Sequence, residues 1–183
     1  MGLKRNEQVL LDDYENWPLE VKQHVACKTR FSLDEEYVKT LYKEADTDEY
    51  NLRYGHIKTY MVSEQLDKDL KNKFSVFNDD LFHRFMFLVT EPNDIVPPHH
   101  DPRPAALYIP LIPTDSNYSP IEFYYKNKIY AINNTDKYRM WVINVSNLHA
   151  VFNNEFERFN LQCSLVKLPY EKFVKKYEEF MEF

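Results

Sequence analysis

Glycine is nearly absent from this chain, which has only Gly2 and Gly55 among its 183 residues. A phosphate-binding P-loop, a G-x-G-x-x-G dinucleotide motif and a G-x-S-x-G nucleophile elbow each need two or more closely spaced glycines. None of these motifs can be written with two glycines so far apart. The sequence therefore excludes the nucleotide-binding and hydrolase motifs that are built on glycine-rich turns.

Cysteine and long apolar runs are scarce as well. Cys27 and Cys163 are the only cysteines, and neither lies in a C-x-x-C pair, which excludes zinc-finger and dithiol redox motifs. No apolar stretch reaches 18 residues, and the run Val9 to Leu11 is too short for a signal peptide. We therefore expect a cytoplasmic protein without a membrane partner.

The net charge and the chain length restrict the possible partners and the number of domains. The net charge is −6, which argues against a nucleic-acid partner because phosphate contacts dominate that kind of affinity. The length fits a single domain over residues 1–183. Aromatic residues make up 16% of the chain, and they favour strands and bulky cores.

Helical patterns stand at the two ends of the sequence. The run Ser32-Leu33-Asp34-Glu35 has the form of a capping box, and the apolar spacing behind it predicts a helix over 33–46. A second helix is predicted after Ser63, and a third from Tyr170, directly after Pro169. We expect a helical N-terminal part over 1–81 and a C-terminal helix over 169–183.

Short apolar or alternating runs fill the middle of the chain. They predict strands at 85–89, 105–111, 121–125, 128–132, 140–145 and 159–166. Turn-like clusters separate them: Pro97-Pro98, Thr114 to Asn117, Lys126-Asn127, Asn133-Asn134 and Asn153-Asn154. This spacing is typical of a β-sandwich or barrel. The predicted fold is mainly β with flanking helices (α+β), with a core over 82–168.

Two histidines and one aspartate could form a metal site. His99 and Asp101 are two residues apart, so in an extended segment both point to the same side. His149 ends a run in which Trp141, Ile143 and Val145 share its parity, which places it toward the core. A buried histidine needs a polar partner, and a metal ion would supply one.

Two histidines and one carboxylate on one face of an ion are the arrangement of non-haem Fe(II) oxygenases. Nine residues beyond His149 lies Arg158, on an alternating run where Arg158, Asn160 and Gln162 share one face. An inward guanidinium needs an anion, which a carboxylate provides in bidentate fashion. A surface ion pair of Arg158 with Glu155 or Glu157 is the alternative.

The segments Pro98-His99-His100-Asp101 with Ala106 to Leu111, and Asn147 to Asn154 with Arg158, resemble the two metal-ligand segments of the 2-oxoglutarate/Fe(II)-dependent oxygenases. The likeness is to small members related to the aspartyl/asparaginyl and prolyl hydroxylases, and it covers roughly residues 82–168. It implies a double-stranded β-helix, or jelly roll. It also implies a dioxygenase that converts 2-oxoglutarate to succinate and hydroxylates a small-molecule, peptide or protein substrate.

By this resemblance His99, Asp101 and His149 bind Fe(II), Arg158 pairs with the distal carboxylate of 2-oxoglutarate, and Tyr108 contacts the same co-substrate. Ascorbate would support the reaction as a reductant. The resemblance also implies that the chain crosses between two sheets after His149. A two-residue hairpin at Asn153-Asn154 would instead place His149 opposite Arg158 within one sheet.

Other functions remain open at this point. The same three ligands suit a cupin-like metal-binding jelly roll without oxygenase activity, in which Arg158 has no role. A non-catalytic jelly-roll binding module is the third possibility. His100 is expected at the surface or behind the ligands, and Arg103 could contact substrate or flank the mouth of the site. The remaining histidines, His24, His56 and His83, are expected to be structural.

Overall fold

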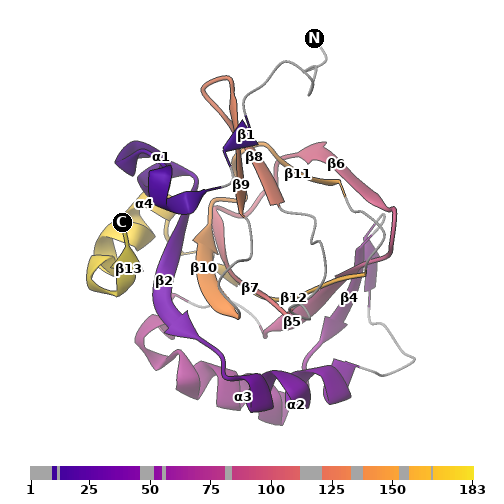
Figure 1. Ribbon diagram of the computed structural model, residues 1–183. Coiled ribbons are helices and arrows are strands. Elements are labelled where there is room, and N and C mark those ends of the chain that lie inside the picture. The colour runs from indigo at the N-terminus through magenta and orange to yellow at the C-terminus, as the bar shows by residue number, and fades with distance from the viewer. Residues whose placement is uncertain are drawn as a thin grey trace.

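Two β-sheets face each other and enclose a common interior (Figure 1). The computed structural model describes residues 10–11, 13–45, 52–54, 57–80, 84–111, 121–132, 138–152, 157–165 and 167–183. The larger sheet has the strand order β13-β2-β10-β7-β12-β5-β4-β3, and the smaller one has the order β1-β9-β8-β11-β6. The predicted mainly β architecture with flanking helices is confirmed.

The larger sheet is antiparallel throughout its described ladders. Its strands, in spatial order, are β13 (Met181–Glu182), β2 (Ala26–Ser32), β10 (Arg139–Ile143), β7 (Ala105–Pro110), β12 (Arg158–Leu165), β5 (Met86–Thr90), β4 (Ile57–Met61) and β3 (Leu52–Tyr54). The smaller sheet contains β1 (Leu10–Leu11), β9 (Lys128–Ile132), β8 (Ile121–Tyr125), β11 (His149–Phe152) and β6 (Ile95–His99). Its only described parallel pair is β1 with β9.

Three of the four described helices begin close to where the sequence predicts them, whereas α1 was not predicted. The described helices are α1 (Leu19–His24), α2 (Glu35–Ala45), α3 (Glu64–Lys73) and α4 (Tyr170–Lys176), with 3-10 turns at Tyr14–Asn16, Ser75–Phe77 and Glu178–Phe180. Ser63 caps α3 as predicted, because its side chain accepts from the Leu66 N–H. None of the described helices is long and apolar enough to cross a membrane.

The cap of α2 differs from the sequence prediction. Asp34, not Ser32, accepts the Tyr37 N–H at 2.8 Å, and Ser32 is the last residue of β2. An aspartate caps a helix as well as a serine does. Either Ser32 or Asp34 could therefore have been the N-cap of this helix. The helix therefore begins two residues later than the predicted start at 33.

Helices α2, α3 and α4 cover the outer face of the larger sheet (Figure 1). Val38 and Leu41 of α2 and Leu66 and Leu70 of α3 are buried in one apolar cluster with that face. Phe173 of α4 belongs to the same cluster. A second apolar cluster lies between the two sheets. The sheet thus separates an outer core from an inner one, and each predicted amphipathic helix buries its stripe on the outside.

Two features differ from the sequence prediction. The first 81 residues, expected to be helical, also contain β1 to β4, so the sheets begin before residue 82. Pro97 and Pro98 were assigned to a turn but lie within β6, at the edge of the smaller sheet. An edge strand tolerates proline, since its outer N–H positions need no ladder partner. The predicted turns at 114–117, 133–134 and 153–154 lie outside the described residues.

The chain crosses from one sheet to the other between β11 and β12. β11 pairs with β6 and β8 in the smaller sheet, whereas β12 pairs with β5 and β7 in the larger one. The crossover is therefore confirmed, and the hairpin that would pair His149 with Arg158 is wrong. As a result, the metal-ligand candidates and Arg158 approach the interior from opposite walls.

Candidate functional site

His99 and His149 stand directly opposite each other on neighbouring antiparallel strands. They are Cα partners in the β6–β11 ladder, and their ring centroids are 4.2 Å apart. Asp101 follows β6 by two residues, and its backbone N–H donates to the Val145 carbonyl at 2.9 Å. The ladder and this bond bring three sequence-predicted residues to one place.

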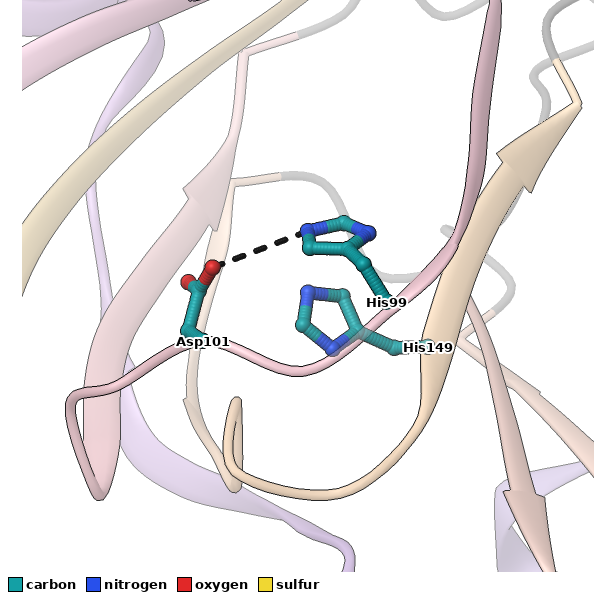
Figure 2. Close-up of side chains that lie close together, drawn as sticks. All are labelled: His99, Asp101 and His149. Carbon is teal, nitrogen blue, oxygen red and sulfur yellow. Dashed lines mark ion pairs between the residues drawn. The ribbon is translucent and has the colours of Figure 1, made fainter.

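The three side chains point toward a common space (Figure 2). One donor atom from each, two imidazole nitrogens and one carboxylate oxygen, lie within 4.8 Å of one another, and His99 Nε2 is 3.6 Å from Asp101 Oδ1. Ligands at about 2.1 Å from an ion and at right angles to each other are about 3 Å apart. The donor set therefore fits a first-row divalent ion after small side-chain movements, with other coordination positions left open.

Backbone carbonyls fix which nitrogen of each imidazole faces this space. His99 Nδ1 lies 2.8 Å from the Pro97 carbonyl, and His149 Nδ1 lies 2.9 Å from the Asn147 carbonyl. A carbonyl oxygen only accepts, so Nδ1 carries the hydrogen in both rings and Nε2 keeps its lone pair. Burial lowers the pKa of His149 to about 4, which keeps its imidazole in the neutral form that binds metals.

Arg103 holds the other oxygen of the aspartate. Its Nε and Nη2 donate to Asp101 Oδ2 at 3.0 and 2.8 Å, which leaves Oδ1 to face His99. Its Nη1 donates to Ser164 Oγ at 2.8 Å, and Gln162 accepts at 2.7 and 2.8 Å when its amide oxygen faces the guanidinium. Arg103 therefore orients the carboxylate toward a one-oxygen contact, a role that the sequence analysis did not assign.

A cavity of about 340 Å³ lies between the sheets beside these residues. His99, Asp101 and His149 line it together with Arg158 and Tyr108. Apolar side chains supply most of the remaining wall: Ile57, Met86, Leu88, Val96, Pro102, Ile121, Ile143, Val145 and Val151. A mostly apolar cavity with a few convergent polar groups is typical of a small-molecule site.

Arg158 is buried in this cavity, with 5% of its surface exposed. Its Nη2 donates to the Tyr108 hydroxyl at 2.7 Å, and that hydroxyl donates to Asn160 Oδ1 at 2.6 Å. The alternative reading, in which Arg158 lies at the surface, is therefore wrong. Alternation along β12 correctly placed Arg158, Asn160 and Gln162 on the inner face, where all three are buried.

The other histidines lie away from the three donor atoms or outside the described residues. His100 is exposed, and its Nδ1 lies 2.8 Å from the Ser146 carbonyl, behind the donors. His24 ends α1 and contacts Glu171 of α4 at 3.3 Å. His56 and His83 lie outside the described residues. Within the described part of the chain, His99, Asp101 and His149 form the one group with metal-ligand spacing.

No family model and no curated protein sequence matches this chain. Solved structures do match. A prolyl-4-hydroxylase from Pseudomonas putida superposes with a TM-score of 0.62 at 13% identity, covering 81% of this chain and 96% of that one. An oxidoreductase of the 2OG-Fe(II) oxygenase family from Burkholderia pseudomallei gives 0.62 at 10% identity, covering 90% and 98%.

The fold is that of the Fe(II)/2-oxoglutarate oxygenases. It is a double-stranded β-helix, as the sequence resemblance implied. A third structure with this fold is a prolyl hydroxylase from Trichoplax adhaerens in complex with a hypoxia-inducible-factor peptide fragment. It matches with a TM-score of 0.58 at 14% identity, covering 84% of this chain and 89% of that one. At these identities the likeness concerns the fold, and the activity must be argued from the cavity.

Proposed function

We propose that this chain is an Fe(II)- and 2-oxoglutarate-dependent oxygenase that hydroxylates its substrate. One observation carries the proposal. The three metal-ligand candidates and the buried guanidinium of Arg158 line the same cavity, although the two histidines and Arg158 come from opposite sheets. A metal at one wall and a cation at the other match the two ends of a 2-oxo dicarboxylate.

In this proposal His99 Nε2, Asp101 Oδ1 and His149 Nε2 hold the iron. Three ligands on one face leave positions for the 2-oxo acid and O₂. Bound Fe(II) supplies the oxidation, in which O₂ converts 2-oxoglutarate to succinate and CO₂ and one oxygen atom enters a C–H bond of the substrate. The protein orients the reactants and keeps the cavity largely free of water.

Arg158 and Tyr108 bind the distal carboxylate of the co-substrate. The guanidinium offers a fork of N–H groups that fits a carboxylate in bidentate fashion. The contact with Tyr108 holds that fork on the inner face of the sheet. The Tyr108 hydroxyl can join it by turning its hydrogen from Asn160 toward the carboxylate, because the hydroxyl hydrogen rotates freely.

The substrate is a small molecule, a peptide or a protein side chain. The Trichoplax structure with its bound peptide fragment supports including peptides among the candidates for this chain. Iron and 2-oxoglutarate are the required partners, and ascorbate enters only as a reductant that keeps the iron in the Fe(II) state.

The direct test is formation of succinate from 2-oxoglutarate with Fe(II), ascorbate and O₂. The parent chain should form succinate slowly alone and faster with a true substrate, and an Asp101→Ala variant should form none. Metal binding without any succinate, before and after addition of small-molecule, peptide and protein candidates, would contradict the oxygenase. It would favour the cupin-like metal-binding alternative.

A further inference from the structure

Three consecutive backbone carbonyls contact the two segments that carry the metal-ligand candidates. They belong to residues 145–147, within the loop 144–148 between β10 and β11, which we name the ligand loop. Their oxygens lie at 2.8 to 2.9 Å from a nitrogen of these segments: Val145 with the Asp101 N–H, Ser146 with His100 Nδ1, and Asn147 with His149 Nδ1. One short loop thus touches both ligand segments.

The ligand loop is itself fastened to the end of α1. The side-chain amides of Asn144 and Asn147 both donate to the His24 carbonyl, each at 2.8 Å. The Asn144 backbone N–H donates to the next carbonyl, that of Val25, also at 2.8 Å. The last carbonyls of a helix lack partners within the helix, and here the ligand loop supplies them.

The amide orientation of Asn144 is fixed from the other side. Ser146 Oγ donates to Asn144 Oδ1 at 2.6 Å, so the amide nitrogen must face His24. Asn147 has two roles at once, since its side chain binds α1 while its carbonyl accepts from His149. A displacement of this residue therefore moves the group that sets the His149 tautomer.

We propose that Asn144 and Asn147 are positioning residues that use the end of α1 as a support for the metal site. The inference rests on the proposed metal centre and adds a role for the N-terminal part of the chain. Groups behind the ligands of a metal orient those ligands, and their loss typically weakens metal binding about 10- to 100-fold. Neither asparagine touches the cavity.

The test is a titration of metal-free protein with Mn²⁺, measured by calorimetry. It compares the parent with Asn144→Ala, Asn147→Ala and the double variant. Because both amides share one carbonyl, each single change should weaken binding less than the double change. We expect the double variant to lose about 10-fold or more in affinity, beyond the product of the single effects.

Tyr170→Phe is the matched control. The Tyr170 hydroxyl donates to the Lys22 carbonyl of the same helix at 2.7 Å, but it does not touch the ligand loop. This variant should lower the thermal unfolding midpoint and leave the Mn²⁺ dissociation constant unchanged. A purely structural role of the two asparagines would make the double variant behave like this control.

Nitrogen NMR of the metal-free protein supplies a second measure. His149 should carry its hydrogen on Nδ1 in the parent, and the Nε2–H tautomer should increase in the double variant. An unchanged tautomer, with Mn²⁺ affinity within about twofold of the parent, would overturn the inference. A parent chain that binds no Mn²⁺ would instead overturn the proposed function, and the inference with it.

Discussion

The guanidinium of Arg158 and the phenol of Tyr108 form a buried polar pair on the inner wall of the larger sheet. They are joined at 2.7 Å, and the Arg158 Cζ lies 5.7 Å from the Tyr108 ring centroid. Burying a guanidinium is costly unless its hydrogen-bonding groups are satisfied. The place of this pair on the cavity wall is the basis of our proposal that it binds the carboxylate of the co-substrate.

Replacing Arg158 by lysine tests this explanation. Lysine keeps the charge but cannot form the two-pronged contact, so Arg158→Lys should raise the 2-oxoglutarate concentration needed for half-maximal succinate formation. Loss of a charge-assisted hydrogen bond predicts an increase of about 10-fold or more. The Mn²⁺ affinity should stay at the parent value.

Arg139→Lys is the control, because it makes the same arginine-to-lysine change at a position outside the cavity. Arg139 begins β10 and contacts Glu182 at 3.3 Å, outside the cavity. This variant should use 2-oxoglutarate as the parent does. If Arg158→Lys also titrates like the parent, the co-substrate assignment of Arg158 is lost.

Alternation and spacing explain which site residues the sequence could predict. His99 and Asp101 share one side, and Arg158 faces inward, because both follow from a two-residue period. Arg103 and the asparagines of the ligand loop act through a carboxylate oxygen and backbone carbonyls. The asparagines contact His24, which is more than 100 residues away in the sequence, and Arg103 also binds Ser164 of the distant strand β12. No local spacing encodes these contacts.

Several turns of this protein have a positive φ angle without using glycine. Lys126 and Asn127 connect β8 to β9 with φ angles of 47° and 62°, and Asn93 has a φ of 63°. A two-residue hairpin with positive φ at both central positions usually takes asparagine or glycine. Asparagine tolerates this region better than most residues, which explains how a sheet-rich chain manages with two glycines.

There is a physical reason why strands β2 and β6 were not predicted from the sequence. β2 is buried along its first four residues and exposed after that, so it shows neither alternation nor a helical period. β6 contains two prolines, which normally mark turns. Both strands are defined by their neighbours, β10 and β11, and pairing with a distant strand is invisible to a local pattern.

The docking of α4 depends on one buried carboxylate. Asp80, 4% exposed, accepts from the Tyr177 hydroxyl and from Lys176 Nζ, both at 2.5 Å. Burial opposes ionisation of Asp80, but the bonds from Lys176 and Tyr177 outweigh it and lower the pKa of the carboxyl. A lowered pKa in the folded state contributes stability above the unfolded pKa, and that stability is lost as the pH falls through the folded value.

Tyr177→Phe should therefore destabilise the protein in a pH-dependent way. At pH 7 we expect a loss of about 1.5–3 kcal/mol in the free energy of unfolding, the range for hydrogen bonds to charged groups. The difference from the parent should shrink as the pH falls through the lowered pKa of Asp80. Urea unfolding at several pH values measures it.

Tyr37→Phe provides the matched control for this measurement. The Tyr37 hydroxyl is buried and has no hydrogen-bond partner among the described residues. Its removal should leave stability unchanged or raise it, at every pH. A loss for Tyr177→Phe that stays constant from pH 7 to the lowest pH at which the parent remains folded would contradict the assigned role of Asp80.

At the scale of the whole molecule, the aromatic excess fills one part of the interior. Tyr14 contacts Trp17 and Trp141 at ring-centroid distances of 5.2 and 5.0 Å, and Trp17 contacts Tyr130 at 5.3 Å. All four side chains are buried between the sheets. Side chains normally fill the interior of barrels of this size. The cavity beside these aromatic residues is therefore a part of the interior that side chains do not fill.

The sequence predicted two facing sheets. It did not predict which side chains pack between the sheets and which pack between the larger sheet and the helices. Composition showed that aromatics were abundant, yet only the strand pairing shows which of them pack between the sheets and which pack under the helices. Phe74 and Phe77 lie in the outer cluster, whereas Trp141 lies in the inner one. The extent of the single domain over 1–183 stays a prediction.

The central claim is that His99, Asp101 and His149 bind one divalent ion. Titration of metal-free protein with Mn²⁺ tests it most directly. Asp69→Ala is the control, because Asp69 is a half-buried carboxylate on α3 that binds the Gln65 side chain away from the cavity. The parent and the control should bind about one ion per chain, and Asp101→Ala should bind none while its thermal unfolding remains cooperative. Binding by Asp101→Ala with the affinity of the parent would contradict the account.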